Sequence, residues 1–102
     1  MPAEELAAYE RHLKSFVEEY LPQGATETHL VRTLASITWR LHRVGALENK
    51  LPPDSFKAFS TLSTYSERLF RQLERTLAQL GITIQRRNQK ALGSFRKNAK
   101  PS

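Results

Sequence analysis

Residues 26–48 read TETHLVRTLASITWRLHRVGALE and predict one long helix, because no proline and no glycine before Gly45 interrupts them. At about 100° per residue, five aliphatic side chains fall within an arc of about 80° and form a core-facing stripe. These are Leu30, Leu34, Ile37, Leu41 and Val44. Trp39 lies almost opposite this stripe. The face predicted to be exposed to solvent is a basic strip of His29, Arg32, Arg40 and Arg43. A helix with apolar residues on two sides is usually covered on both, so this helix is predicted to be central.

The segment before this helix predicts a first amphipathic helix that ends near Leu21. Its apolar residues recur every three or four positions from Leu6 to Tyr20. Residues 22–24, Pro-Gln-Gly, predict a short turn, and Thr26 is expected to cap the central helix. Helices joined by so short a connection are expected to be antiparallel.

The segment after the central helix predicts a proline turn at 52–53, a short aromatic segment and a third long helix. Phe56 and Phe59 are expected to pack as a lid over the end of the bundle. The third helix carries the stripe Leu62, Tyr65, Leu69, Leu73, Leu77, Leu80 and Ile84. The predicted fold is all-α: a three-helix antiparallel, up-down-up bundle with a short aromatic helical segment before the last helix.

The net charge of +6 over 102 residues is concentrated towards the C-terminus. Residues 75–102 contain seven basic and no acidic residues, whereas residues 1–74 contain nine basic and ten acidic residues. Because the apolar periodicity fades from Arg86, we expect a bundle domain of residues 1–85 and a frayed, flexible basic tail of residues 86–102. Such asymmetry indicates a polyanionic partner, although basic tails also serve only to keep a protein in solution.

The chain lacks the residue patterns of common catalytic and metal sites. It contains no cysteine, and His29 and His42 are too far apart to share one ion. It has neither a phosphate-binding glycine loop nor a G-x-S-x-G motif. We therefore expect no enzymatic activity, no cofactor and no metal. Without an apolar run of about 18 residues or a signal-like N-terminus, the protein is expected to be cytoplasmic with no membrane span.

Two groups of basic residues are candidates for contacts to phosphates. The central helix contributes Arg32, Arg40 and Arg43, although Glu10, Glu18 and Glu19 of the first helix are an alternative set of partners for them. The tail contributes Arg86, Arg87, Lys90, Arg96, Lys97 and Lys100. The predicted function is a non-catalytic helical module that binds DNA or RNA through phosphates with weak sequence selectivity.

An alternative function is a protein-interaction or assembly module, such as a helical homodimer or an accessory subunit, with a solubilising basic tail. Trp39 is the residue on which this alternative depends. It is expected either to pack against the third helix or to lie at an oligomer interface or a base-stacking site. The stripe of the third helix is longer than that of the first, which also favours a homodimer.

Three stretches resemble a group of short uncharacterised bacterial helical proteins. They are EEYLPQG at 18–24, WRLHR at 39–43, and LSTYSERLFRQLERTL at 62–77. The resemblance implies three helices in one domain and implies no activity.

Overall fold

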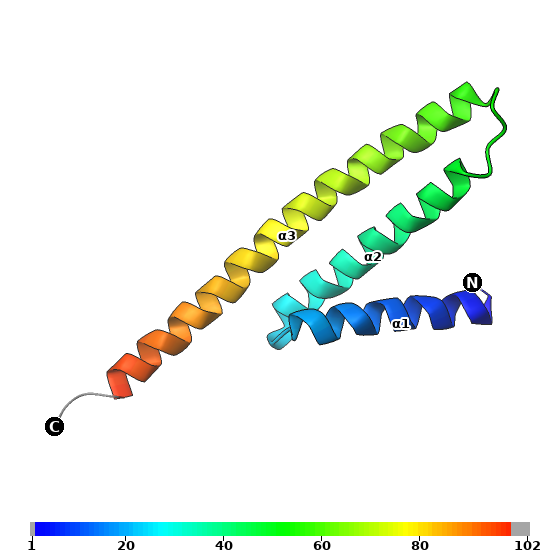
Figure 1. The fold of residues 1–102 in the computed structure, drawn as a ribbon. Coiled ribbons are helices and arrows are strands. Elements are labelled where there is room, and N and C mark those ends of the chain that lie inside the picture. The colour runs from blue at the N-terminus through cyan, green and yellow to red at the C-terminus, as the bar shows by residue number, and fades with distance from the viewer. Residues whose placement is uncertain (1, 99–102) are drawn as a thin grey trace.

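The structure is a computed structural model that describes residues 2–98. It contains three helices and, within these residues, no strand: α1 (Ala3–Tyr20), α2 (Gly24–Glu48) and α3 (Phe56–Asn98). The helices run up, down and up, with α2 between the other two (Figure 1). The predicted all-α class and three-helix antiparallel topology are therefore confirmed.

The central position of α2 is confirmed by its burial on two sides. Leu30, Leu34, Ile37 and Val44 of the predicted stripe are buried, and they form the core with Leu69 and Leu80 of α3. Phe16 and Tyr20 of α1 pack against the part of this core nearest the first turn. Among the described residues, the backbones of α1 and α3 do not contact each other. The fold is thus two helix pairs that share α2.

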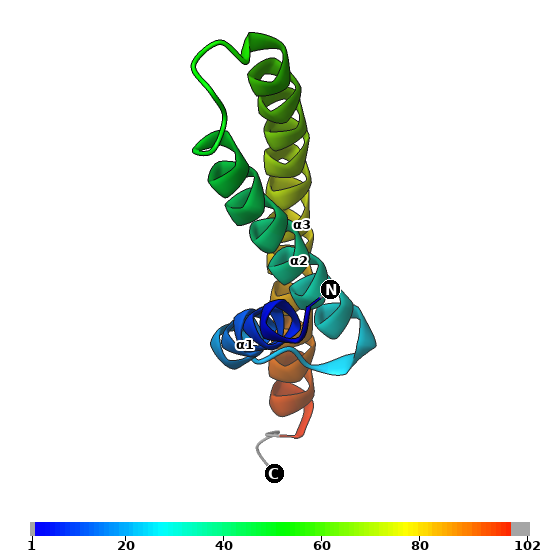
Figure 2. The same ribbon diagram turned by 90° about the vertical axis from the view of Figure 1, so that its right-hand side faces the viewer.

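The molecule is long and thin because α3 extends beyond its partners. Its principal extents are 76 × 29 × 16 Å, and its radius of gyration is 19.3 Å, against about 13 Å for a compact chain of this length. The 43 residues of α3 span about 64 Å. Viewed from the side, α2 and α3 run together along the long axis, whereas α1 is seen nearly end-on (Figure 2). Much of the apolar surface of α3 consequently stays exposed.

The turn between α1 and α2 is built by two residues with left-handed backbone. Leu21 ends α1 at φ 46°, and its N–H donates to the carbonyl of Val17. Gly24 has φ 79°, which a glycine adopts without a Cβ clash. Helix α2 therefore begins at Gly24 with Gln23 as its N-cap residue, and the prediction that Thr26 caps it is wrong.

The prediction of a separate aromatic lid before α3 is also wrong. Phe56 and Phe59 belong to the first turn of α3 itself, which starts directly after the proline turn. Phe56 is 84% exposed and Phe59 is 50% exposed. They line a hollow with Glu48 and the turn at 51–55 and do not cover the core, because α2 ends at Glu48 and α1 diverges from α3 (Figure 1).

The expected frayed tail is helical over most of its length. Helix α3 passes the predicted domain boundary at residue 85 without interruption and continues to Asn98. Residues 86–98 contain no proline, and adding a residue to an existing helix avoids the cost of nucleation. Arg96 and Lys97 thus lie within the helix, whereas Lys100 lies outside the described residues.

Candidate nucleic-acid interface

Three hollows lie between α2 and α3, on a different face of α2 from the one that α1 covers, and a fourth, lined by α3 alone, adjoins them. Their volumes are about 260 to 460 Å³ each. Neighbouring hollows share one lining residue each, His29, then Arg40, then Tyr65, so they form a row. We call this feature the basic furrow. It is lined by Thr26, His29, Leu30, Arg32, Thr33, Ser36, Ile37, Arg40, Arg43, Val44 and Leu47 of α2, and by Ser60, Thr61, Leu62, Thr64, Tyr65, Arg68, Gln72, Gln79, Ile82, Thr83 and Arg86 of α3.

The charge of the furrow is of one sign. Its basic residues are His29, Arg32, Arg40 and Arg43 from α2, and Arg68 and Arg86 from α3. Among the described residues, no aspartate or glutamate lines it. A hollow of one charge sign beside a low-dielectric core concentrates ions of the opposite sign. The furrow is therefore an anion-attracting surface.

Helical periodicity explains how α3 contributes to this surface. Positions 68, 75 and 86 are separated by about two and three turns, so their three arginines fall close to one line along the helix. Glu67 and Glu74 fall about 100° away around the helix axis. The acids of α3 are thus kept off the side that borders the furrow.

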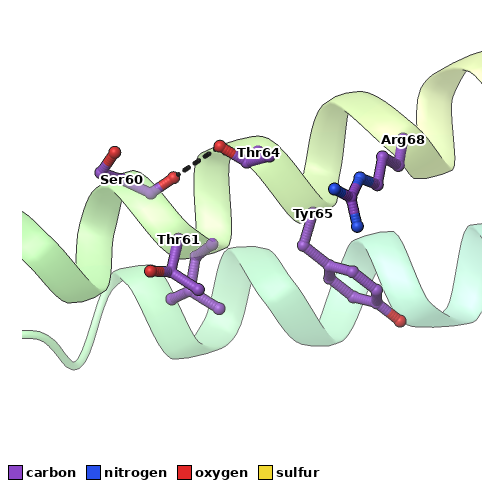
Figure 3. Close-up of a pocket in the computed structure, with 6 residues that line it drawn as sticks. Ser60, Thr61, Thr64, Tyr65 and Arg68 are labelled. Atoms are coloured by element: carbon purple, nitrogen blue, oxygen red, sulfur yellow. Dashed lines mark hydrogen bonds between the residues drawn. The ribbon is translucent and has the colours of Figure 1, made fainter.

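The furrow also presents neutral hydrogen-bonding groups, several of which are already engaged. The hydroxyls of Thr33, Thr61, Thr64 and Thr83 each donate to the carbonyl one turn earlier, as Thr64 does to Ser60 in Figure 3. The described side-chain hydrogen bonds do not include the amides of Gln72 and Gln79. Arginine side chains and these amides are therefore among the donors able to meet an anion.

The first-helix acids neutralise the central arginines only in part. Arg43 Nη2 lies 3.0 Å from Glu5 Oε1, and Glu18 instead lies 3.9 Å from Lys14 Nζ. Within the described residues, Arg32 and Arg40 form no ion pair. The alternative that Glu10, Glu18 and Glu19 neutralise the strip is therefore wrong, because Glu5 is the acid of α1 that pairs with it, at Arg43.

Arg87 has a different environment from its neighbour Arg86. Its Nε donates to Glu27 Oε2 at 2.7 Å and its Nη2 donates to Glu27 Oε1 at 3.3 Å. The carboxylate of Glu27 is only 3% exposed and also accepts the backbone N–H of Gln23 at 3.1 Å. The Arg87 guanidinium, helped by Gln23, lowers the pKa of Glu27 against the opposing effect of burial. Arg87, predicted to contact nucleic acid, is thus an ion-pair partner that ties α3 to the start of α2.

Trp39 packs against α1 rather than against the third helix. Its ring lies 5.5 Å from that of Tyr9 and 5.5 Å from that of His12. His12 Nε2 lies 2.9 Å from both the carbonyl of Ala35 and Thr38 Oγ1, which holds the imidazole on α2. The prediction that Trp39 meets the third helix is wrong, because the opposite stripe of α2 already takes that partner.

The structure brings together only part of the predicted set of basic residues. Arg32, Arg40, Arg43 and Arg86 line the furrow, and Lys90 is exposed on α3 beyond it. Arg68 and Tyr65 line it but were not predicted as site residues. The arginine spacing along α3 is the sequence signal that identifies Arg68.

Comparison of the chain with protein-family models, with curated proteins and with solved structures finds no match. Among residues 2–98, none of the three helices is both long enough and apolar enough to cross a membrane. No three histidine, aspartate or glutamate side chains in the described part of the chain cluster closely enough to hold a metal ion.

Proposed function

We propose that this protein is a non-catalytic helical module that binds nucleic acid by phosphate contacts along the basic furrow. The observation that carries the proposal is that six basic side chains line this row of hollows, with no acidic lining residue among those described. A nucleic-acid backbone is a polyanion whose charges repeat at a short, regular spacing. It can therefore engage the whole furrow at once, which a small anion cannot.

The length of the furrow suits several phosphate contacts. Arg68 and Arg86 are 18 positions apart on one helix, or about 27 Å. One strand of B-form DNA carries a phosphate about every 3.4 Å of axis, so this length matches about eight phosphates. Contacts to phosphates position a protein without reading bases, which is why weak sequence selectivity is expected.

The proposal includes a cytoplasmic location and no catalytic step. A chain without cysteine fits a reducing compartment. Within the described residues, no hollow combines a histidine with a carboxylate, as general acid–base chemistry on a substrate commonly requires.

The test is a salt titration of binding to labelled mixed-sequence DNA, both single-stranded and duplex, measured by fluorescence anisotropy. The variant Arg32→Ala/Arg40→Ala/Arg68→Ala removes three charges from the furrow. Each lost phosphate contact should make the negative slope of log K against log salt shallower by about 0.7 to 0.9. Circular dichroism checks that the helices remain.

The matched control removes three charges from outside the furrow, as Arg11→Ala/Lys14→Ala/Lys50→Ala. An equal loss of affinity in this control would mean that net charge, not the furrow, determines binding. Absence of binding by the unaltered protein near 50 mM salt would refute the function. Truncation at residue 85 is unsuitable, because it removes Arg87 and leaves the buried Glu27 without its ion-pair partner.

A second candidate, assembly into a homodimer, is favoured by an apolar stripe on a different side of α3. Phe59, Phe70 and Leu77 are 50%, 53% and 41% exposed, and they fall within about 20° of one another on the helix. Several large exposed apolar side chains on one line of a helix favour a partner that covers them. Light scattering should then give a dimer mass that Phe70→Glu reduces to that of a monomer; a monomer at all concentrations contradicts this candidate.

A further inference from the structure

The basic furrow contains one feature that phosphate binding leaves unused, an aromatic ring. Tyr65 lines the two hollows near the C-terminal end of α2 and is the only aromatic residue among those lining the furrow. Its side chain is 41% exposed. The ring reaches from α3 across the seam towards α2, with Arg68 on the same side of α3 (Figure 3). A partly exposed ring in a polyanion-binding furrow is a surface on which a base can stack.

The charges around Tyr65 fit a stacked nucleotide. Arg40 lines one of its hollows and Arg68 lines the other. Neither forms an ion pair with a described residue, whereas Arg43 in the same place is held by Glu5. A base on the ring carries its own phosphates within a few ångströms, so Arg40 and Arg68 are placed to contact the backbone on either side of it.

The size of the furrow favours a single strand over a duplex. Packed helices generally lie about 8 to 10 Å apart, and the hollows between α2 and α3 measure only about 260 to 410 Å³ each. A duplex keeps its bases stacked inside and can reach only the arginines at the rim. A single strand has unpaired bases, so its backbone can follow the hollows while one base stacks on an aromatic ring.

We propose that the basic furrow takes single-stranded nucleic acid, with one base stacked on Tyr65 and the flanking phosphates on Arg40 and Arg68. This inference rests on the proposed function and specifies its partner. It assigns Tyr65 a role in choosing single strands over duplexes, and it does not require a particular base.

The experiment compares binding of the full chain to a labelled mixed-sequence 12-nucleotide single strand and to the 12-base-pair duplex of the same sequence. Tyr65→Leu keeps apolar bulk and removes the ring, whereas Tyr65→Phe keeps the ring and removes the hydroxyl. Phe56→Ala is the matched control, because it deletes an exposed aromatic residue of α3 that lies outside both the furrow and the apolar stripe. Circular dichroism at each step confirms folding.

The expected result is tighter binding of the single strand, reduced about 5- to 150-fold by Tyr65→Leu and unchanged by Tyr65→Phe and Phe56→Ala. Duplex binding should not respond to Tyr65→Leu. Equal affinity for both forms, or a similar loss from Tyr65→Phe or Phe56→Ala, overturns the stacking role while leaving phosphate binding intact. Failure to bind either form overturns the proposed function itself.

Discussion

Two flanks of α2 differ in what covers them. The covered flank meets α1, where Tyr9, His12 and Trp39 pack ring against ring. The open flank borders the basic furrow, where Arg32 and Arg40 have no ion-pair partner among the described residues. Helix α2 thus packs Trp39 against α1 and keeps Arg32 and Arg40 on a side where no described carboxylate pairs with them. We therefore expect the stability of the fold to depend on the covered flank and the core, and nucleic-acid binding to depend on the open flank.

The largest expected effect is at the core between the flanks. Leu34 is 1% exposed, and Leu34→Ala should lower the free energy of unfolding by about 2 to 5 kcal/mol. Arg40→Ala, on the open flank of the same helix, should change it by less than about 0.5 kcal/mol. Urea denaturation followed by circular dichroism measures both. A comparable loss of unfolding free energy from Arg40→Ala would show that the open flank also stabilises the fold, contrary to the proposed difference between the flanks.

A smaller effect separates the adjacent arginines Arg86 and Arg87. Arg87→Ala leaves the buried carboxylate of Glu27 without its bidentate partner and should lower the melting temperature. Arg86→Ala should leave the melting temperature unchanged and weaken nucleic-acid binding instead. If the two variants give the same melting temperature and the same affinity for nucleic acid, the assignment of Arg87 to stability and of Arg86 to binding is wrong.

The ion pair between Glu27 and Arg87 also predicts how stability depends on pH. The pKa of Glu27 in the folded chain lies below its ordinary value of 4.5, so the folded state binds this proton less readily than the unfolded state does. Its stabilising contribution is therefore complete above about pH 4.5 and is lost as the pH falls through the lower folded pKa. Thermal melts from pH 6 to pH 3 measure this loss. Glu27→Gln should flatten the profile in that range, and an unaltered profile would mean that other carboxyl groups cause it.

The smallest effect is expected at the edge where the covered and open flanks meet. Arg43 lines the furrow and also pairs with Glu5, and both side chains are partly exposed. Such a pair contributes about 1 kcal/mol or less. A double-mutant cycle of Glu5→Gln and Arg43→Gln measures this coupling by urea denaturation. A coupling energy well above that value would mean that the Glu5–Arg43 pair is a main stabilising contact between α1 and α2.

The local sequence was sufficient to predict the helices and the central place of α2. Leu30, Leu34, Ile37 and Val44 recur with helical spacing, and burial of such a stripe does not depend on which helix covers it. The proline turn and the Pro-Gln-Gly turn likewise end helices by local sterics. These properties reside in residues a few positions apart, so the sequence by itself determined them.

Tertiary structure alone decided which partner each side of α2 receives and what each arginine does. Glu27 and Arg87 are 60 positions apart, and only the return of α3 alongside α2 makes them an ion pair. The same return places Tyr65 beside Arg40, and the divergence of α1 leaves Phe56 and Phe59 exposed. Helical periodicity assigns a residue to a face of its own helix, but the crossing of two helices determines which faces meet. The furrow is a product of that crossing.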